Sequence, residues 1–230
     1  MTDKVIIVTG GTEGLGKSIS KLLNAQYIVI AVSNNKQKIQ QAKEDKICRE
    51  AYYCDIADPE NIEDIIKNIL AKYSKIDVLI NNAGVWVAGD LEENSYQDIA
   101  KVIMVNTVGT INMTKAVIPS MKKLKQGKII NICSVDAFET KEKRSIYAAS
   151  KFGIRGFTEN IRRDLKTFGV QVIGLYPGLI KTNLFENAGK NRDLSEAMES
   201  EEAAEVVKFC VDNDNVVLEQ VIFRSPEEKL

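Results

Sequence analysis

The stretch Thr9-Gly10-Gly11-Thr12-Glu13-Gly14-Leu15-Gly16 decides the fold, because it separates two different hydrophobic patterns. A β-branched run, Val5 to Thr9, precedes it, and a segment with helical periodicity, Gly16 to Ala25, follows it. Glycine lets the backbone turn tightly and approach a diphosphate, and the start of a helix offers free N–H groups to an anion. A glycine-rich turn alone is a weak signal, but its position between a first strand and a helix favours a dinucleotide-binding loop.

The same alternation of short and long apolar segments continues along the chain. Short runs predict further strands at Tyr27–Val32, Ala51–Cys54, Val78–Asn81, Lys128–Cys133, Val170–Tyr176 and Gln220–Phe223. Amphipathic stretches predict crossover helices at Glu60–Lys72, Tyr96–Lys122, Ile146–Phe168 and Glu202–Val211. We therefore expect an α/β protein with a three-layer Rossmann fold, in which helices cover both faces of a doubly wound parallel sheet of about seven strands. No linker or repeat interrupts the pattern, so residues 1–230 are predicted to form one domain.

Composition excludes several classes of protein. Hydrophobic residues make up 44% of the 230 residues and charged residues 27%, which is ordinary globular usage. The 31 basic and 32 acidic residues form no long block, so no nucleic-acid partner is expected. No apolar run is long enough for a membrane span, and the start, Met1-Thr2-Asp3-Lys4, lacks the pattern of a signal peptide. These features predict a soluble cytoplasmic protein with no membrane partner.

The residues available for proton transfer are restricted, because the sequence has no histidine. This excludes a Ser-His-Asp hydrolase and histidine general-base catalysis. The four cysteines, Cys48, Cys54, Cys133 and Cys210, show no metal-ligand spacing, so no metal site is expected. Any proton transfer must use Tyr, Lys, Asp, Glu, Cys or water.

One tyrosine and one lysine have the spacing of a proton-transfer pair. Tyr147 and Lys151 stand four residues apart in a strong helical segment, so they share one face of the helix. A nearby ammonium group stabilises a phenolate and would lower the pKa of Tyr147 from about 10. The Tyr-x-x-x-Lys spacing by itself is common on protein surfaces, so other residues of the sequence must show whether this pair is catalytic.

Taken together, these motifs resemble the classical short-chain dehydrogenase/reductase (SDR) family. The glycine pattern Thr-Gly-x-x-x-Gly-x-Gly, the segment Asn81-Asn82-Ala83-Gly84 and the turn Pro177-Gly178-Leu179-Ile180-Lys181-Thr182 occur in the family's order, and the match runs from about Val5 to Thr182. The resemblance implies an NAD(P)-dependent oxidoreductase that transfers hydride between a nicotinamide cofactor and a carbonyl or alcohol substrate.

The resemblance also assigns catalytic roles. Tyr147 would protonate the substrate oxygen, Ser134 would hold that oxygen, and Lys151 would lower the pKa of the tyrosine and bind the nicotinamide ribose. Asn106 would complete a water-linked proton relay to the lysine. The expected substrate contacts are Ser134, Asp136 and Trp86, with residues 183–200 as a substrate loop.

For the cofactor, Asp55 would accept a hydrogen bond from the adenine amine, and the Ile180 backbone with Thr182 would hold the carboxamide. The full set of expected contacts is Gly10, Thr12, Glu13, Gly14, Leu15, Gly16, Ser33, Asn34, Asp55, Ile56, Asn82, Ala83, Gly84, Tyr147, Lys151, Pro177, Gly178, Ile180 and Thr182. No acid ends the second strand to repel a 2′-phosphate, so Ser33 and Asn34 favour NADP(H). Glu13 in the glycine loop argues the other way, and NAD(H) stays an alternative.

Two other readings compete with a carbonyl or alcohol oxidoreductase. A sugar-nucleotide epimerase would need a larger substrate domain than the short segment after Thr182. A non-catalytic dinucleotide-binding sensor would be expected to lack some of the four catalytic residues, and none is missing. The family resemblance further implies a homodimer or homotetramer assembled through the long helices Tyr96–Lys122 and Ile146–Phe168.

Overall fold

A single seven-stranded parallel sheet forms the centre of the molecule. The computed structural model describes residues 4–228, so Met1 to Asp3, part of the segment tested for a signal peptide, lies outside the described residues. The strands lie in the order β3-β2-β1-β4-β5-β6-β7. Their bounds are β1 Val5–Thr9, β2 Ile28–Ser33, β3 Glu50–Tyr53, β4 Val78–Asn81, β5 Gly127–Ile132, β6 Val170–Pro177 and β7 Gln220–Phe223. The predicted Rossmann sheet is confirmed, with every strand within one residue of its expected bounds.

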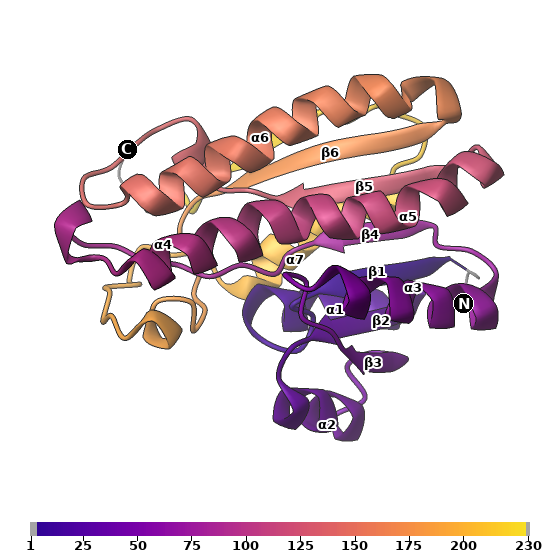
Figure 1. Ribbon diagram of the computed structural model, residues 1–230, viewed down its shortest axis with the longest axis horizontal. Helices are drawn as coiled ribbons and strands as arrows, with labels where there is room; N and C mark the ends of the chain where they lie inside the picture. The colour runs from indigo at the N-terminus through magenta and orange to yellow at the C-terminus, as the bar shows by residue number, and fades with distance from the viewer. Residues whose placement is uncertain (1–3, 229–230) are drawn as a thin grey trace.

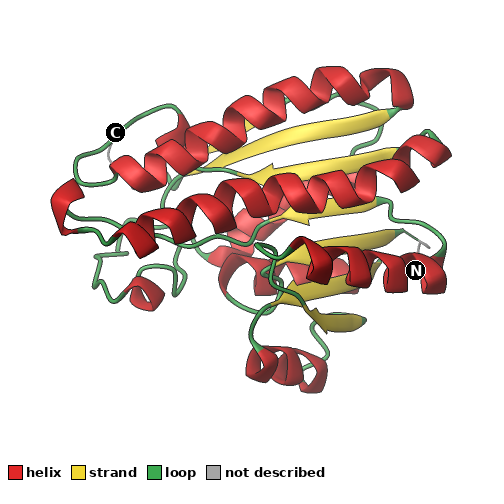
Figure 2. Ribbon diagram, viewed as in Figure 1, coloured by secondary structure: helices red, strands yellow, loops and turns green. Residues whose placement is uncertain are grey.

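Helices cover both faces of this sheet (Figures 1 and 2). One face carries α1 Gly14–Asn24, α2 Lys36–Glu44 and α7 Ser200–Asp212, and the other carries α3 Pro59–Tyr73, α5 Thr110–Leu124 and α6 Ser145–Leu165. Side chains of β1 alternate between the two cores, since Ile6 packs in one and Ile7 in the other. Both faces of the sheet are therefore buried, as a parallel sheet requires. Within residues 4–228, no helix is long and apolar enough to cross a membrane.

The strand order reverses between β1 and β4, and this reversal positions the site. From β1 the chain builds outward through β2 to β3, and it then returns to pair β4 with the other edge of β1. Consequently, the loops that follow β1 and β4 lead away from each other at the carboxyl ends of these two strands. Such a switch point is where open α/β sheets bind their ligands.

The helices depart from expectation in two places. Helix α2 was not predicted, because only Ile39 and Ala42 are buried along it and its apolar period is weak. Its one local signal is Asn35, whose side chain accepts a hydrogen bond from Lys38 N at 3.0 Å and caps the helix. The single helix predicted over Tyr96–Lys122 is wrong in detail: α4 Tyr96–Val102 and α5 are joined by a π-helical segment, Ile103–Gly109.

Candidate active site

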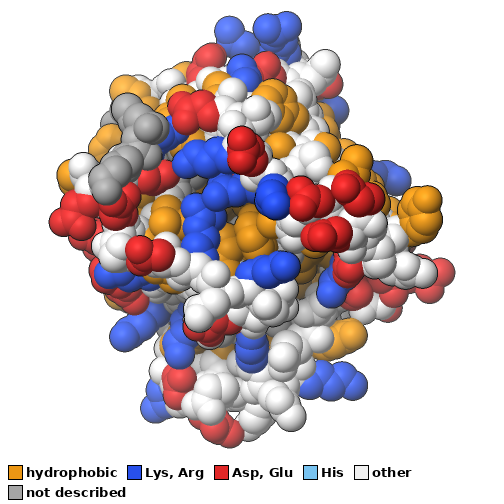
Figure 3. All heavy atoms as spheres, turned by 90° about the vertical axis from the view of Figure 1, so that its left-hand side faces the viewer, with side chains coloured by type: hydrophobic (Ala, Val, Ile, Leu, Met, Phe, Trp, Pro, Cys, Tyr) orange, Lys and Arg blue, Asp and Glu red, His pale blue; other side chains and the backbone are white. Residues whose placement is uncertain are grey.

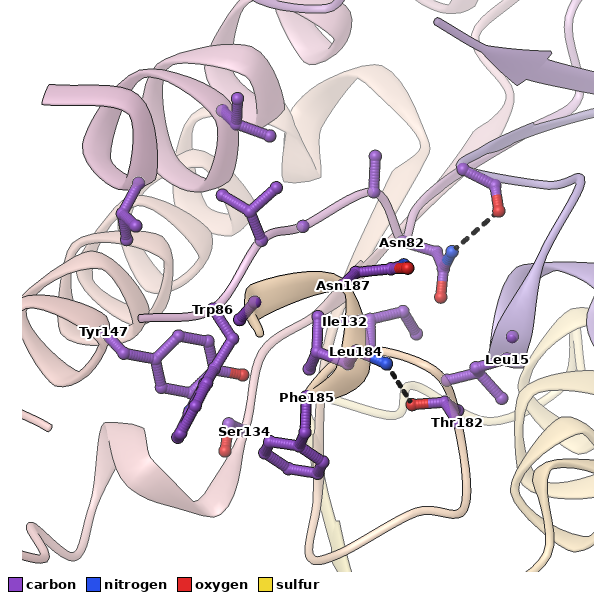
Figure 4. A pocket seen from close by; sticks show the side chains of 18 of the residues that line it. Leu15, Asn82, Trp86, Ile132, Ser134, Tyr147, Thr182, Leu184, Phe185 and Asn187 are labelled. Carbon is purple, nitrogen blue, oxygen red and sulfur yellow. Dashed lines mark hydrogen bonds between the residues drawn. The ribbon is translucent and has the colours of Figure 1, made fainter. Parts of the chain in front are cut away.

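A cavity of about 630 Å³ opens at the carboxyl ends of the strands, over the switch point. Figure 4 shows Tyr147, Ser134 and Trp86 together at one end of this space and Leu15 and Thr182 at the other. Nearly all of the residues predicted to touch cofactor or substrate line the cavity. The predicted site residues that do not line it are Thr12, Gly16 and Asn106.

The glycine loop is shaped for close approach of a ligand. Gly10 and Gly14 have φ values of +62° and +49°, a conformation that strains residues with a Cβ atom. A Cβ on Gly14 would stand 3.3 Å from the Thr182 side chain across the cavity. A Cβ on Gly16 would fall 2.1 Å from Gly10 O, which explains why this position beneath the loop needs glycine. The loop thus leaves open the space that a diphosphate at the start of α1 would fill.

Hydrogen bonds hold the two diverging loops together. Thr9 Oγ1 accepts from the backbone N–H groups of Asn82 and Ala83, each at 3.0 Å, and Asn82 Nδ2 donates to Thr9 O at 2.9 Å. Thr9 is 1% exposed, so these bonds are sheltered from water. The ends of β1 and β4 therefore form one rigid wall of the cavity.

The residues expected near the adenosine ribose and adenine lie at the ends of β2 and β3. Ser33 Oγ accepts from Asn35 N at 3.2 Å, and Asp55 Oδ1 accepts from Ala57 N at 2.9 Å. Glu13 forms an ion pair with Lys38 of α2. Sequence reasoning missed Lys38 because it missed the helix that carries it. The negative charge of Glu13, which argued against a 2′-phosphate, is thus opposed by a cation.

Tyr147 and Lys151 are buried on one face of α6, as their spacing predicted. Lys151 Nζ lies 5.5 Å from the centroid of the Tyr147 ring and donates to Ile132 O at 3.1 Å. Ser134 follows β5, and its Oγ accepts from Asp136 N at 3.1 Å. The fold thus brings the phenol, the ammonium group and the Ser134 hydroxyl to one end of the cavity.

Burial has the largest effect on the pKa values of this pair. Burial, and secondly the charge of Asp136, raise the pKa of Tyr147 above its ordinary value, while a hydrogen bond from Ser134 and the charge of Arg144 act against them. Burial likewise lowers the pKa of Lys151. Burial is the largest of these influences on Tyr147, and the role of Lys151 in lowering its pKa stays a prediction.

Asn106 lies in the π-helical segment, behind the cavity wall. Its Oδ1 accepts from Val85 N at 2.8 Å, and its Nδ2 donates to Val85 O at 2.9 Å and to Ser150 Oγ at 3.0 Å. Its backbone oxygen accepts from Thr110 Oγ1 at 2.7 Å. The side chain thereby ties the loop that follows β4 to α6, next to Tyr147 and Lys151. Single π-helical turns often occur at functional sites.

The remaining wall near Tyr147 combines aromatic and charged groups. Trp86 meets Phe185 edge to face, with ring centroids 4.9 Å apart. Phe185 belongs to the predicted substrate loop. Met198 of the same loop forms an isolated parallel β-bridge with Ile180. Asp136 forms an ion pair with Arg144 at 3.3 Å. Phe185 and Arg192 of the predicted substrate loop line the cavity, and so does Arg144. Among residues 4–228, no cluster of three His, Cys, Asp or Glu side chains is arranged to hold a metal ion.

Comparisons with known proteins agree with this architecture. Residues 4–193 match the family model for short chain dehydrogenases. An oxidoreductase of Staphylococcus saprophyticus is 30% identical over 192 residues, 80% of this chain and 81% of that protein. One of Staphylococcus epidermidis is 28% identical over 211 residues, 91% of each chain.

Solved structures share the fold. Levodione reductase superposes with a TM-score of 0.90 at 24% identity, covering 98% of this chain and 97% of that one. An alcohol dehydrogenase of the archaeon Thermococcus sibiricus, solved in complex with 5-hydroxy-NADP, gives a TM-score of 0.89 at 21% identity, covering 100% and 99%. Because the family model covers most of the sequence and the relatives match over nearly their whole length, the chain belongs to the short-chain dehydrogenase family of oxidoreductases.

Proposed function

We propose that this protein transfers hydride between a nicotinamide dinucleotide and a carbonyl or alcohol group of a small molecule, with Tyr147 as the proton donor. The observation that carries the proposal is one continuous cavity, which runs from the glycine loop to Ser134 and the buried Tyr147. A dinucleotide bound along it would place its diphosphate on the glycine loop and its nicotinamide beside Tyr147. The whole described chain, with residues 183–200 as the substrate loop, would act as one catalytic domain.

The residues present fit such a cofactor. The diphosphate would lie on the N–H groups at the start of α1, where glycines keep the space open. Asp55 would take the adenine amine, and Ile180 with Thr182 would hold the carboxamide. The bound cofactor would supply or accept the hydride.

The side chains around Tyr147 can handle the proton. Tyr147 would give its proton to the carbonyl oxygen in the reducing direction. Ser134 would hold the same oxygen by a hydrogen bond and stabilise the charge that develops on it. Asn106 would position α6 through Val85 and Ser150. This arrangement suits reduction of a carbonyl.

NADP(H) is the cofactor that we propose. Ser33 and Asn34 line the cavity after β2, where no acid stands to repel a 2′-phosphate. The ion pair with Lys38 supports this proposal, because it opposes the charge of Glu13. The alternative, NAD(H), would require the ribose hydroxyls to bind without an acidic partner.

We also propose a homodimer or homotetramer formed through α4, α5 and α6. Tyr96 of α4 is 89% exposed, and Met104 and Phe152 are 40% and 42% exposed. These apolar side chains support an interface on this side of the molecule. Light scattering tests the assignment, and a monomer at working concentrations would refute it.

The test of the reaction is the Tyr147→Phe variant. We expect purified wild-type protein to oxidise NADPH in the presence of aldehydes or ketones. We expect the variant to bind NADPH normally and to lose turnover by about 10²- to 10⁴-fold, the usual contribution of a general acid. Normal turnover in the variant would refute Tyr147 as the proton donor. Cofactor binding without turnover in the wild type would instead favour the dinucleotide sensor.

A further inference from the structure

Arg192 is a partly buried cation at the cavity that has no anionic partner among residues 4–228. Its guanidinium carbon lies 4.7 Å from the centroid of the Phe185 ring, and the residue lines the cavity. Within the described residues, no carboxylate lies at ion-pair distance from it and no hydrogen-bond acceptor is in reach. Removing a charge from water without a partner is costly. Burial accordingly lowers the pKa of Arg192.

A second arginine reaches the same end of the cavity. Arg144 stands three residues before Tyr147, at the start of α6, and its side chain is 17% exposed. It pairs with Asp136, whose side chain is 5% exposed and whose backbone N–H donates to Ser134 Oγ. Asp136 therefore balances one of the two arginines. The charge of Arg144 contributes to the lowered pKa of Arg192, as expected for cations that face one space.

The other acid at this end is already engaged elsewhere. Glu228 lines the cavity, but its Oε2 accepts from the Leu179 backbone N–H at 2.9 Å. Its charge opposes the lowering of the Arg192 pKa without forming an ion pair. Figure 3 shows Lys and Arg side chains gathered around a hollow whose floor is hydrophobic. Within the described residues, Arg192 thus has no carboxylate at ion-pair distance.

We propose that the substrate carries a carboxylate, which Arg192 binds together with Arg144, and an apolar body that lies against Trp86 and Phe185. The planar guanidinium fork matches a carboxylate, and a single carboxylate supplies the charge that Arg192 lacks. The edge-to-face aromatic pair, 4.9 Å between centroids, offers apolar surface beside the carboxylate site. This inference rests on the proposed function for the place of the reacting carbonyl, but the carboxylate site can be tested without turnover.

The binding test uses the fluorescence of Trp86, the only tryptophan in the sequence. We would titrate the protein with benzoate and with benzamide, which differ in charge and match in size. Benzoate is expected to bind at least about tenfold more tightly, as a charge-assisted pair predicts. Arg192→Gln should remove this preference, whereas Lys190→Gln, an equal charge change outside the cavity, should keep it. Equal binding of the two ligands, or an unchanged preference in Arg192→Gln, would overturn the proposal.

A turnover test separates the carboxylate site from the reaction. We would compare kcat/KM for 4-carboxybenzaldehyde and for its methyl ester with NADPH. A preference for the acid of about tenfold or more, lost in Arg192→Gln, supports the proposal. Equal reduction of both compounds refutes it and leaves the oxidoreductase function intact. Reduction of neither compound nor of other carbonyls, with the benzoate preference present, would refute the proposed function and keep the carboxylate site.

Discussion

The packing beneath the glycine loop predicts opposite effects for two glycine-to-alanine substitutions. In Gly16→Ala, the new Cβ would lie 2.1 Å from Gly10 O and 2.5 Å from Asn82 Nδ2, so the backbone of the loop must move. Overpacking of this kind costs ~1–3 kcal/mol, and contact with backbone places it at the upper end. The higher helix propensity of alanine offsets ~1 kcal/mol, which leaves a net loss of ~2 kcal/mol.

Gly156 provides the matched control, because it lies in α6 and nothing stands within 4 Å of a Cβ built on it. Gly156→Ala should stabilise the protein by ~1 kcal/mol through helix propensity alone. Urea unfolding of both variants beside the wild type measures the difference, which should appear as midpoints shifted in opposite directions. The loop displacement should also weaken NADPH binding in Gly16→Ala only. Equal stability of the two variants would refute the packing argument.

Three further expectations concern charge, proton linkage and positioning. Lys38→Gln removes the ion-pair partner of Glu13 in the glycine loop, so the affinity for NADPH should fall about tenfold relative to the affinity for NADH. Lys43→Gln, at the far end of α2, should leave the ratio of the two affinities unchanged, and fluorescence titration measures that ratio in each variant. Burial and a hydrogen bond to an aspartate raise the pKa of Tyr27 to about 12, so the contribution of this tyrosine to the free energy of unfolding is complete below pH ~10 and is lost as pH rises toward 12. Urea unfolding at pH 9 and pH 11 should therefore show a smaller loss of stability with pH in Tyr27→Phe than in the wild type. An equal loss in both proteins would contradict this expectation. Asn106→Ala removes both hydrogen bonds to the Val85 backbone and should lower the free energy of unfolding by ~2–3 kcal/mol, which a midpoint equal to that of the wild type would rule out.

The sheet could be predicted from the sequence because its strands are short, buried and bounded by clear breaks. Val5–Thr9 and Val78–Asn81, for example, agree with the structure at both ends. Helix α2 escaped prediction because a helix at the margin of the core needs only two buried side chains. The π-helical segment was not predicted, because no local pattern in Ile103–Gly109 marks a change of helix type. At its end, a Cβ on Gly109 would come 2.7 Å from Ile56, so this glycine permits close packing between distant segments.

Site residues that belong to the family's spaced motifs could be predicted from the sequence. Properties that depend on how deeply a side chain is buried could not. The spacing of Tyr147 and Lys151 placed both on one helix face, but the direction of the Tyr147 pKa depends on a degree of burial that no local pattern reveals. Arg192 lies in the predicted substrate loop, residues 183–200, but the sequence does not show which side chains of that loop reach the cavity. In the structure its guanidinium carbon lies 4.7 Å from the centroid of the Phe185 ring, and the residue lines the cavity.

The central claim is that the glycine loop and the catalytic tyrosine serve one dinucleotide site, and parallel titration with NADPH and NADH tests it most directly. Cofactor fluorescence and quenching of Trp86, which lines the same cavity, report binding at both ends of the site. We expect both signals to saturate together, with NADPH binding more tightly than NADH. Failure of both nucleotides to bind would contradict the claim.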